Sequence, residues 1–340
     1  MRTKQLAVTK SLALLLLAAS LPVLAQTNWE VKKTLPIGGQ GSWDYLTVDP
    51  ATHRLFVPRS THTMIIDANS GKTLGDIPGQ KNAHGVAIVP EVGRGFISDG
   101  GGDGAIIIFD LKTYATLGKI AAQPDADGII YDPAVGHVLV VSGDNGVLMS
   151  FKPDIDPTNG KIDAPINLGG KPEFLAADGK GKVYINLQDK DEVAVVDFKA
   201  GKVVARWPVA PGGSPVGMSI DTKTRRLFIG CRKPQKLIVM STDTGKVLSD
   251  LPIGAGVDAT KFDGGQAFAS CRDGSLAVAS ETSPGKFEIV QTVKTPQGAR
   301  TMGIDPTTHT IYLPTAEFET GSTGRPAPKP GTFMIVVVAR

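Results

Sequence analysis

Short apolar runs alternate with turn-forming residues along almost the whole chain after residue 28. One phrase recurs: an apolar strand end, a turn that usually carries aspartate, and a second apolar strand, as in Val48-Asp49-Pro50 running on to Val57. Each copy continues into a third apolar strand, such as Ile106 to Asp110, and then into a turn and a fourth strand. Short strands with turn chemistry between them, and no sustained 3.6-residue periodicity, are typical of β-propeller blades.

The repeat has a regular spacing. The second residue of the seven copies falls at positions 49, 89, 132, 178, 221, 263 and 305, so successive copies begin 40 to 46 residues apart. A period in this range indicates a propeller of four-stranded blades rather than a sandwich. The last copy has three strands, and residues 29–37 supply a fourth, because Lys33 to Gly38 echoes Leu248 to Gly254. We therefore expect an all-β, seven-bladed β-propeller of antiparallel blades, closed by an N-terminal strand that completes the C-terminal blade.

These phrases resemble the YVTN-repeat, YncE-like β-propeller family of exported bacterial proteins. The resemblance rests on Asp49-Pro50-Ala51-Thr52, on Arg54-Leu55-Phe56-Val57 and on Ile65-Ile66-Asp67 with Ser70-Gly71-Lys72, and it runs from about residue 28 to the C-terminus. The family's tetrapeptide is degenerate here, for example Phe56-Val57-Pro58-Arg59. The resemblance implies a propeller that serves as a binding platform or, less often, as a metal-dependent hydrolase.

Residues 1–25 have the pattern of a secretory signal peptide. Arg2, Lys4 and Lys10 form a basic start, residues 12–24 are mostly apolar, and small residues precede a cleavage site after Ala25. This predicts a periplasmic or secreted protein with one propeller domain over residues 26–340 and no membrane span after cleavage. An uncleaved anchor is the alternative interpretation.

The formal charge of +3 belongs to this segment. Without its three bases the chain has 33 basic and 33 acidic residues. A nucleic-acid-binding protein usually has an excess of positive charge, so the balanced charge of this chain argues against that function. Nucleic-acid binding through a local basic patch on the loops is therefore the third and weakest hypothesis. The patch would comprise Arg59, Arg232, Lys233, Lys236 and Arg272.

One position in the repeat carries most of the candidate chemistry. In a propeller, the segment that enters the innermost strand of each blade lines the central channel. Five residues before the repeat's second position, six of the seven blades have an ionisable side chain. This register contains Asp44, His84, Asp127, Glu173, Val216, Asp258 and Arg300.

Two interpretations of this ring stay open. Asp44, His84, Asp127, Glu173 and Asp258 could hold a divalent cation such as Ca²⁺, Mg²⁺, Mn²⁺ or Zn²⁺, because carboxylates and imidazole are the usual ligands. In the other interpretation the ring is solvated and structural. Arg300 then neutralises its neighbours Asp258 and Asp44, and His84 is a hydrogen-bonded spacer.

We accordingly expect a monomeric binding or interaction module whose small ligand or protein partner binds at the mouth of the channel. The alternative is a metal-dependent hydrolase of small esters or lactones. In that hypothesis the cation polarises a carbonyl group or activates water, and His84 or a spare carboxylate moves the proton.

Two further features have open interpretations. Cys231 and Cys271 occupy matching places in adjacent blades, where an oxidising compartment favours a disulfide but the distance between blades opposes it. Residues 316–332 form a long Pro- and Gly-rich loop in the last blade, on the face of the channel mouth. This loop is either a lid or partner-docking arm in polyproline conformation, or an ordinary disordered insertion.

Overall fold

The repeated aspartate closes the first hairpin of a blade. In a computed structural model that describes residues 28–321 and 326–340, Asp49, Asp132, Asp221 and Asp305 accept hydrogen bonds through Oδ1. The donor is the backbone N–H two residues further on, at 2.8 to 3.2 Å. Aspartate favours this turn because its short side chain replaces a backbone acceptor. The predicted signal segment 1–25 lies outside the described residues.

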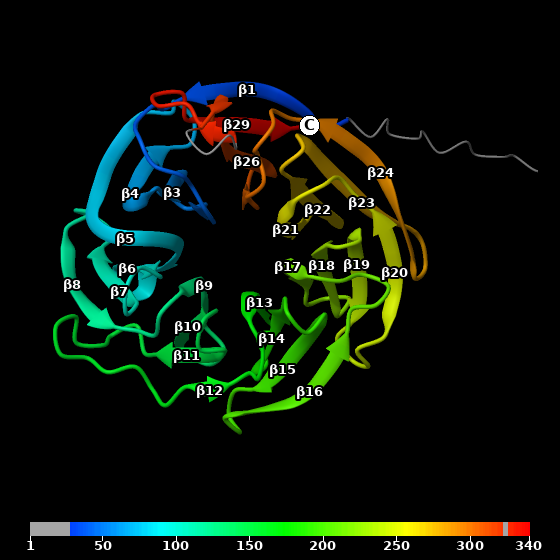
Figure 1. Cartoon of the computed structure of the whole chain (residues 1–340), viewed down its shortest axis with the longest axis horizontal. Helices are drawn as coiled ribbons and strands as arrows, with labels where there is room; N and C mark the ends of the chain where they lie inside the picture. The colour runs from blue at the N-terminus through cyan, green and yellow to red at the C-terminus, as the bar shows by residue number, and fades with distance from the viewer. Residues whose placement is uncertain (1–27, 322–325) are drawn as a thin grey trace, which may run out of the picture.

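Five antiparallel sheets of four strands stand around a common axis (Figure 1). In each sheet the strands follow one another outward from the axis. One sheet consists of β9 (Ala126–Asp132), β10 (His137–Ser142), β11 (Val147–Phe151) and β12 (Ile166–Asn167). The next consists of β13 (Pro172–Ala177), β14 (Lys182–Leu187), β15 (Glu192–Asp197) and β16 (Lys202–Pro208). The third consists of β17 (Pro215–Asp221), β18 (Arg226–Arg232), β19 (Gln235–Ser241) and β20 (Val247–Pro252). The fourth consists of β21 (Val257–Asp263), β22 (Gln266–Cys271), β23 (Ser275–Ser283) and β24 (Lys286–Lys294).

The fifth sheet joins the two ends of the described chain. Its order is β1-β29-β26-β25, with β1 pairing antiparallel to β29 from Glu30↔Ala339 to Pro36↔Met334. The predicted closure by an N-terminal strand is therefore confirmed, and Figure 1 shows blue β1 beside red β29. The strands are β1 (Glu30–Pro36), β25 (Gly303–Asp305), β26 (Thr310–Thr315) and β29 (Met334–Ala339).

The prediction of seven four-stranded blades is wrong. The structure has five four-stranded blades, and the rest of the ring is one continuous seven-stranded sheet of order β2 to β8. The reason is the 17-residue strand β5, in which Ala83 pairs both with Ser60 and with Asp99 and so joins the two halves of the sheet. The strands are β2 (Thr47–Asp49), β3 (Arg54–Pro58), β4 (Ser60–Asp67), β5 (Thr73–Val89), β6 (Arg94–Asp99), β7 (Ala105–Asp110) and β8 (Thr116–Ala121).

The core lies between the sheets. Second strands such as β10 and β22 are buried on both faces, which explains why most of their residues are apolar. Fourth strands alternate, as in β16, because one face meets solvent. The one helix in the described part of the chain is the 3₁₀ turn η1 (Pro90–Val92). No helix there is long and apolar enough to cross a membrane.

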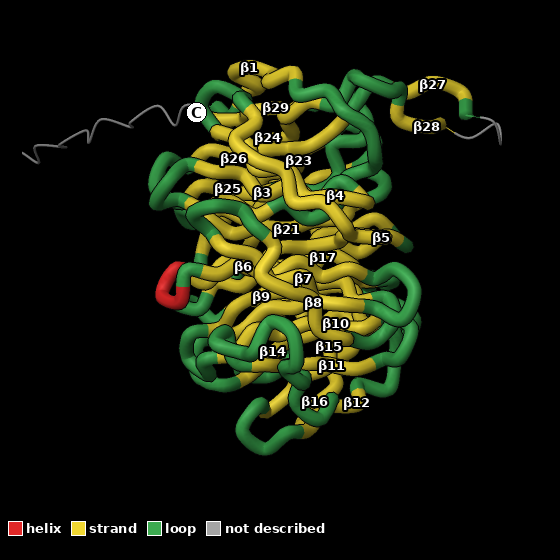
Figure 2. The backbone as a smooth tube through the Cα atoms, turned by 90° about the vertical axis from the view of Figure 1, so that its left-hand side faces the viewer, coloured by secondary structure: helices red, strands yellow, loops and turns green. Residues whose placement is uncertain are grey.

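The long loop of the last blade is partly folded. Within residues 316–332, β27 (Phe318–Thr320) pairs antiparallel with β28 (Pro326–Pro328), so its proline-containing segment is a strand there rather than an isolated polyproline stretch. Figure 2 shows this hairpin standing away from the body of the molecule. The Phe318 ring lies 6.2 Å from the Trp43 ring, which anchors the arm beside the segment that leads to Asp44.

Candidate functional site at the channel mouth

The innermost strands all begin on one face of the ring, and we call the residues at these starts the channel mouth. Asp44 and Arg300 lie in the segments just before β2 and β25, while the other four candidates lie within strands. These four are His84 in β5, Asp127 in β9, Glu173 in β13 and Asp258 in β21.

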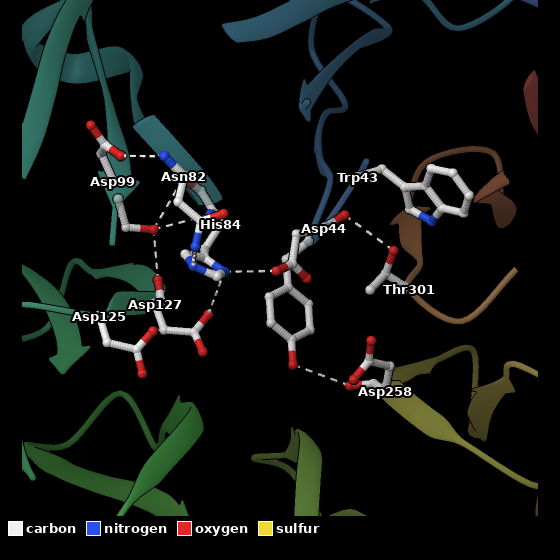
Figure 3. A network of polar contacts seen from close by, with 12 residues as sticks. Trp43, Asp44, Asn82, His84, Asp99, Asp125, Asp127, Asp258 and Thr301 are labelled. Atoms are coloured by element: carbon white, nitrogen blue, oxygen red, sulfur yellow. Dashed lines mark hydrogen bonds and ion pairs between the residues drawn. The ribbon is translucent and has the colours of Figure 1, made fainter. Parts of the chain in front are cut away.

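Three of the predicted residues form one cluster, which Figure 3 shows with His84 between two carboxylates. His84 Nδ1 lies 2.8 Å from Asp44 Oδ2 and 3.5 Å from Asp127 Oδ1. One ligand atom from each residue lies within 4.8 Å of the others. Asp127 Oδ1 is buried and has no hydrogen-bond partner among the described residues. The cluster therefore offers two carboxylates and an imidazole to a shared point.

The backbone around the cluster holds these side chains in place. Ser98 Oγ donates to the Asp127 carbonyl at 2.6 Å, and Thr301 Oγ1 donates to the Asp44 carbonyl at 3.1 Å. Asp99 is fully buried, and its Oδ1 accepts from the Asn82 backbone N–H at 2.7 Å. The Asn82 side-chain amide in turn lies 2.8 Å from His84 Nε2. Both nitrogens of His84 are thus engaged, which fixes its ring orientation.

Burial makes negative charge costly in this cluster. It raises the pKa of Asp44, and it raises the pKa of Asp127 well above its usual range, with help from the charges of Asp44 and Glu173. Burial by itself lowers the pKa of His84, but the hydrogen bond to Asp44 and the charge of Asp127 outweigh it and raise the value to about 9. The local field therefore favours a positive charge, either a proton on His84 or a cation that displaces this proton and binds the neutral imidazole.

The predicted five-residue metal set is not assembled as one group. Asp258 belongs to a separate ion network, in which its Oδ1 accepts from Arg232 Nη2 and its Oδ2 from Arg300 Nε. Arg300 also donates to the Trp43 carbonyl at 3.2 Å. Two guanidinium groups already neutralise Asp258, as the structural interpretation of the ring expected for Arg300.

Glu173 stands apart from both groups. It has no hydrogen bond or ion pair to another described side chain, and burial raises its pKa to about 7. The charge of Arg232 opposes this shift, and that of Asp258 adds to it. Glu173 therefore contributes to the negative field at the mouth without joining the cluster of Asp44, His84 and Asp127.

Arg59 positions the segment that carries Asp44, a role that the sequence analysis missed. Its side chain is 1% exposed, lies 3.6 Å from the centre of the Phe333 ring and has no ion-pair partner among the described residues. Its guanidinium instead donates to backbone carbonyls of residues 38–42. The acceptors are Gly38 at 3.3 Å, Gln40 at 2.8 Å, Gly41 at 3.0 Å and Ser42 at 3.1 Å.

The predicted basic patch is smaller than the sequence suggested. Arg59 is buried, Arg232 is paired with Asp258, and Lys236 is paired with Asp250. Apart from the buried Arg59, only Lys233 and Arg272 of the five have no ion pair within the described ranges. Two separated charges provide little of the electrostatic attraction that nucleic-acid binding requires.

Both cysteines lie in the described part of the chain, and both are free and buried. They belong to different core clusters, one around Val193 and Ile238 and the other around Phe228 and Ala267. Burial raises the pKa of each thiol to about 12. Because the thiolate is the reactive form, these residues are inert core side chains in the folded protein.

This arrangement predicts two titratable thiols only after unfolding. The native protein should react with fewer than about 0.2 equivalents of a thiol reagent such as Ellman's reagent, since buried thiols are protonated and inaccessible. Unfolding without reductant should release both thiols. If the unfolded, unreduced protein shows none, the two cysteines are paired.

The propeller fold is also supported by comparison with solved structures. A chain of the hydrazine synthase of Kuenenia stuttgartiensis is similar, with a TM-score of 0.68 over 85% of this chain and 95% of that chain. The two are 14% identical, so the likeness shows the fold alone. No protein-family model matches the sequence, and no curated protein matches it.

Proposed function

We propose that this chain is an exported binding module of the YVTN-repeat, YncE-like kind that holds a divalent cation at the channel mouth. In this proposal residues 1–25 direct export to the periplasm or the medium and are removed after Ala25. The cation then provides the attachment point for a small ligand or a protein partner. The propeller scaffold is consistent with an interaction module, and the cation site is proposed from the chemistry of the residues at the channel mouth.

The observation that carries the proposal is the half-buried cluster of Asp44, His84 and Asp127. Its three ligand atoms lie within 4.8 Å of one another. Asp127 Oδ1 accepts no hydrogen bond among the described residues, and its contact there is the 3.5 Å ion pair with His84 Nδ1. A buried carboxylate oxygen without a donor is costly, and a coordinated cation would satisfy it. Burial that raises the pKa values of Asp44 and Asp127 adds to the advantage of a cation.

The ligand set favours a first-row transition ion or zinc over calcium. Two carboxylates and one imidazole suit Mn²⁺ or Zn²⁺, whereas Ca²⁺ usually takes about 6 to 8 oxygen ligands. The side chains of Asp44 and His84 are 20% and 16% exposed, so solvent reaches the cluster. A ligand that arrives through the mouth could therefore complete the coordination.

The test is a calorimetric titration of the purified protein with Mn²⁺, Zn²⁺, Ca²⁺ and Mg²⁺ after chelator treatment. We expect one equivalent of Mn²⁺ or Zn²⁺ to bind. His84→Ala and Asp127→Asn each remove one direct ligand. Loss of a residue that only supports a ligand weakens metal binding by up to about 100-fold, so loss of a direct ligand should weaken it by more than that.

His309→Ala is the matched control. His309 Nδ1 lies 2.6 Å from Asp263 Oδ2, so it also forms a histidine–aspartate pair, but at the turn that precedes β26. This variant should bind the cation like the parent protein. Equal binding by the parent, His84→Ala and Asp127→Asn would contradict a site at this cluster.

A further inference from the structure

A second distinctive position lies three residues beyond the mouth residues on each innermost strand. Six of the seven side chains there are uncharged, and the seventh is a lysine. In chain order they are Thr47, Ala87, Ile130, Ala176, Ser219, Lys261 and Gly303. The lysine therefore departs from the repeat and has no explanation in the blade architecture.

Lys261 lines a cavity of about 540 Å³ that lies between the innermost strands and is open to solvent. Six of these strands contribute to the wall, namely β2, β5, β9, β13, β17 and β21. The wall is largely apolar, with Val86, Ile88, Ile129, Leu175, Met218 and Ile220 among its residues. A volume within about 300–1,000 Å³ and an apolar lining with few polar groups are typical of small-molecule sites.

Two aromatic rings separate this cavity from the channel mouth. Tyr45 and Phe174 line its end, and their ring centres lie 4.5 Å apart. They directly follow the mouth residues Asp44 and Glu173, neither of which lines the cavity. Tyr45 Oη also donates to the Asp258 carbonyl at 3.2 Å, which fixes the ring. The cavity is therefore distinct from the proposed cation site.

Lys261 has no ion-pair partner among the described residues that line the cavity. Its ammonium group lies 5.6 Å from the centre of the Phe174 ring, and it has no hydrogen bond or ion pair within the described ranges. Asp132, the one carboxylate among the lining residues, is 2% exposed, and its Oδ1 accepts from the Ala134 N–H at 2.9 Å. Its Oδ2 is buried without a hydrogen-bond partner among the described residues, and no ion pair joins it to Lys261. Burial lowers the pKa of Lys261, as expected for an ammonium that no anion offsets.

We infer that this cavity binds a small monoanion with an apolar body, such as an aliphatic or aryl carboxylate. The carboxylate pairs with the ammonium of Lys261, and the apolar body lies along the wall. A charge-assisted hydrogen bond in an apolar surrounding is stronger than one in water, so the single amine selects acids over neutral molecules of the same shape.

The test compares octanoate with 1-octanol by isothermal titration calorimetry, with EDTA present to empty any cation site. Wild-type protein should bind octanoate at one site. Lys261→Met keeps a flexible apolar side chain of similar length and should weaken octanoate by at least about tenfold, while changing 1-octanol by less than about twofold. Lys72→Met, at an exposed turn position, should change neither.

A second variant tests the volume of the cavity. Ala177, half-buried at the end of β13, lines the cavity, so Ala177→Trp should occupy part of it and weaken binding of both molecules. Thermal melting establishes that each variant is folded. The inference is overturned if wild-type protein does not bind octanoate, or if folded Lys261→Met binds it equally well. Loss of octanoate binding in His84→Ala but not in Lys261→Met would place the ligand at the mouth and would also overturn it.

Discussion

A chain that begins at residue 37 is expected to lose cooperative unfolding. Residues 28–36 carry β1, which supplies the outer strand of the sheet formed by β25, β26 and β29. Without β1, strand β29 has an unpaired edge and the buried side chain of Leu35 is lost from its core cluster. Exposed edges pair with other chains and promote aggregation.

Trp29 extends the same closure to the preceding blade. Its Nε1 donates to Gln266 Oε1 at 2.8 Å, and its backbone exchanges two hydrogen bonds with the Gln291 side chain at 2.7 and 3.0 Å. The ring of Trp29 packs edge-on against Phe268 at 5.0 Å. The N-terminal segment therefore joins two neighbouring sheets, and its removal opens the ring at this junction.

Urea unfolding followed by circular dichroism measures this effect. The parent protein should show one steep transition, and the shortened chain a broad one or none. The control replaces residues 319–327 of the projecting arm with a short Gly-Ser linker of similar length and should keep the steep transition. An unchanged transition after loss of β1 would contradict closure by this strand.

Arg59→Ala is expected to destabilise the protein by about 3–5 kcal/mol, the range for breaking a buried charged network. The substitution leaves four backbone carbonyls of residues 38–42 without their donor and opens a cavity against Phe333. Arg59→Lys should restore little, because an ammonium cannot reach four carbonyls spread along a segment as a planar guanidinium does. Burial lowers the pKa of Arg59 to about 10, which leaves the guanidinium charged near neutral pH.

The same substitution should also weaken cation binding, because residues 38–42 lead into Trp43 and Asp44. Arg94→Ala is the matched control, since Arg94 donates to the Pro153 and Ile155 carbonyls far from the mouth. Urea unfolding and cation titration should separate the two variants: Arg94→Ala loses some stability and keeps its affinity. Full stability of Arg59→Ala would show that residues 38–42 do not depend on this guanidinium.

Much of the scaffold could be predicted from the repeated phrase. In most of the seven copies the aspartate at the repeat's second position forms a turn through its Oδ1, so this local chemistry marks the hairpins in the sequence. Counting back from it identified Asp44, His84 and Asp127, which the structure brings together. The division into blades was predicted wrongly because nothing in residues 78–82 reveals that β5 continues from one half of its sheet into the other.

The remaining site residues could not be predicted because they reach the mouth from outside the counted register. Arg232 lies at the end of β18 and pairs with Asp258 across neighbouring blades, while Arg59 acts through backbone carbonyls that carry no sequence signal. Lys261 is different. The sequence identifies it as the one charged residue among the seven residues three positions beyond the mouth. Only the structure shows that it lines a cavity.

The most direct test of the account is the metal content of native protein purified without chelator and without an affinity tag that binds metals. Elemental analysis should find close to one equivalent of a divalent ion, Mn²⁺ or Zn²⁺, per chain. His84→Ala prepared in parallel should contain less than about a tenth of that amount, because its affinity is expected to fall by more than about 100-fold. Absence of any divalent ion, together with unchanged melting on adding Mn²⁺, Zn²⁺, Ca²⁺ or Mg²⁺, would contradict a cation site at Asp44, His84 and Asp127.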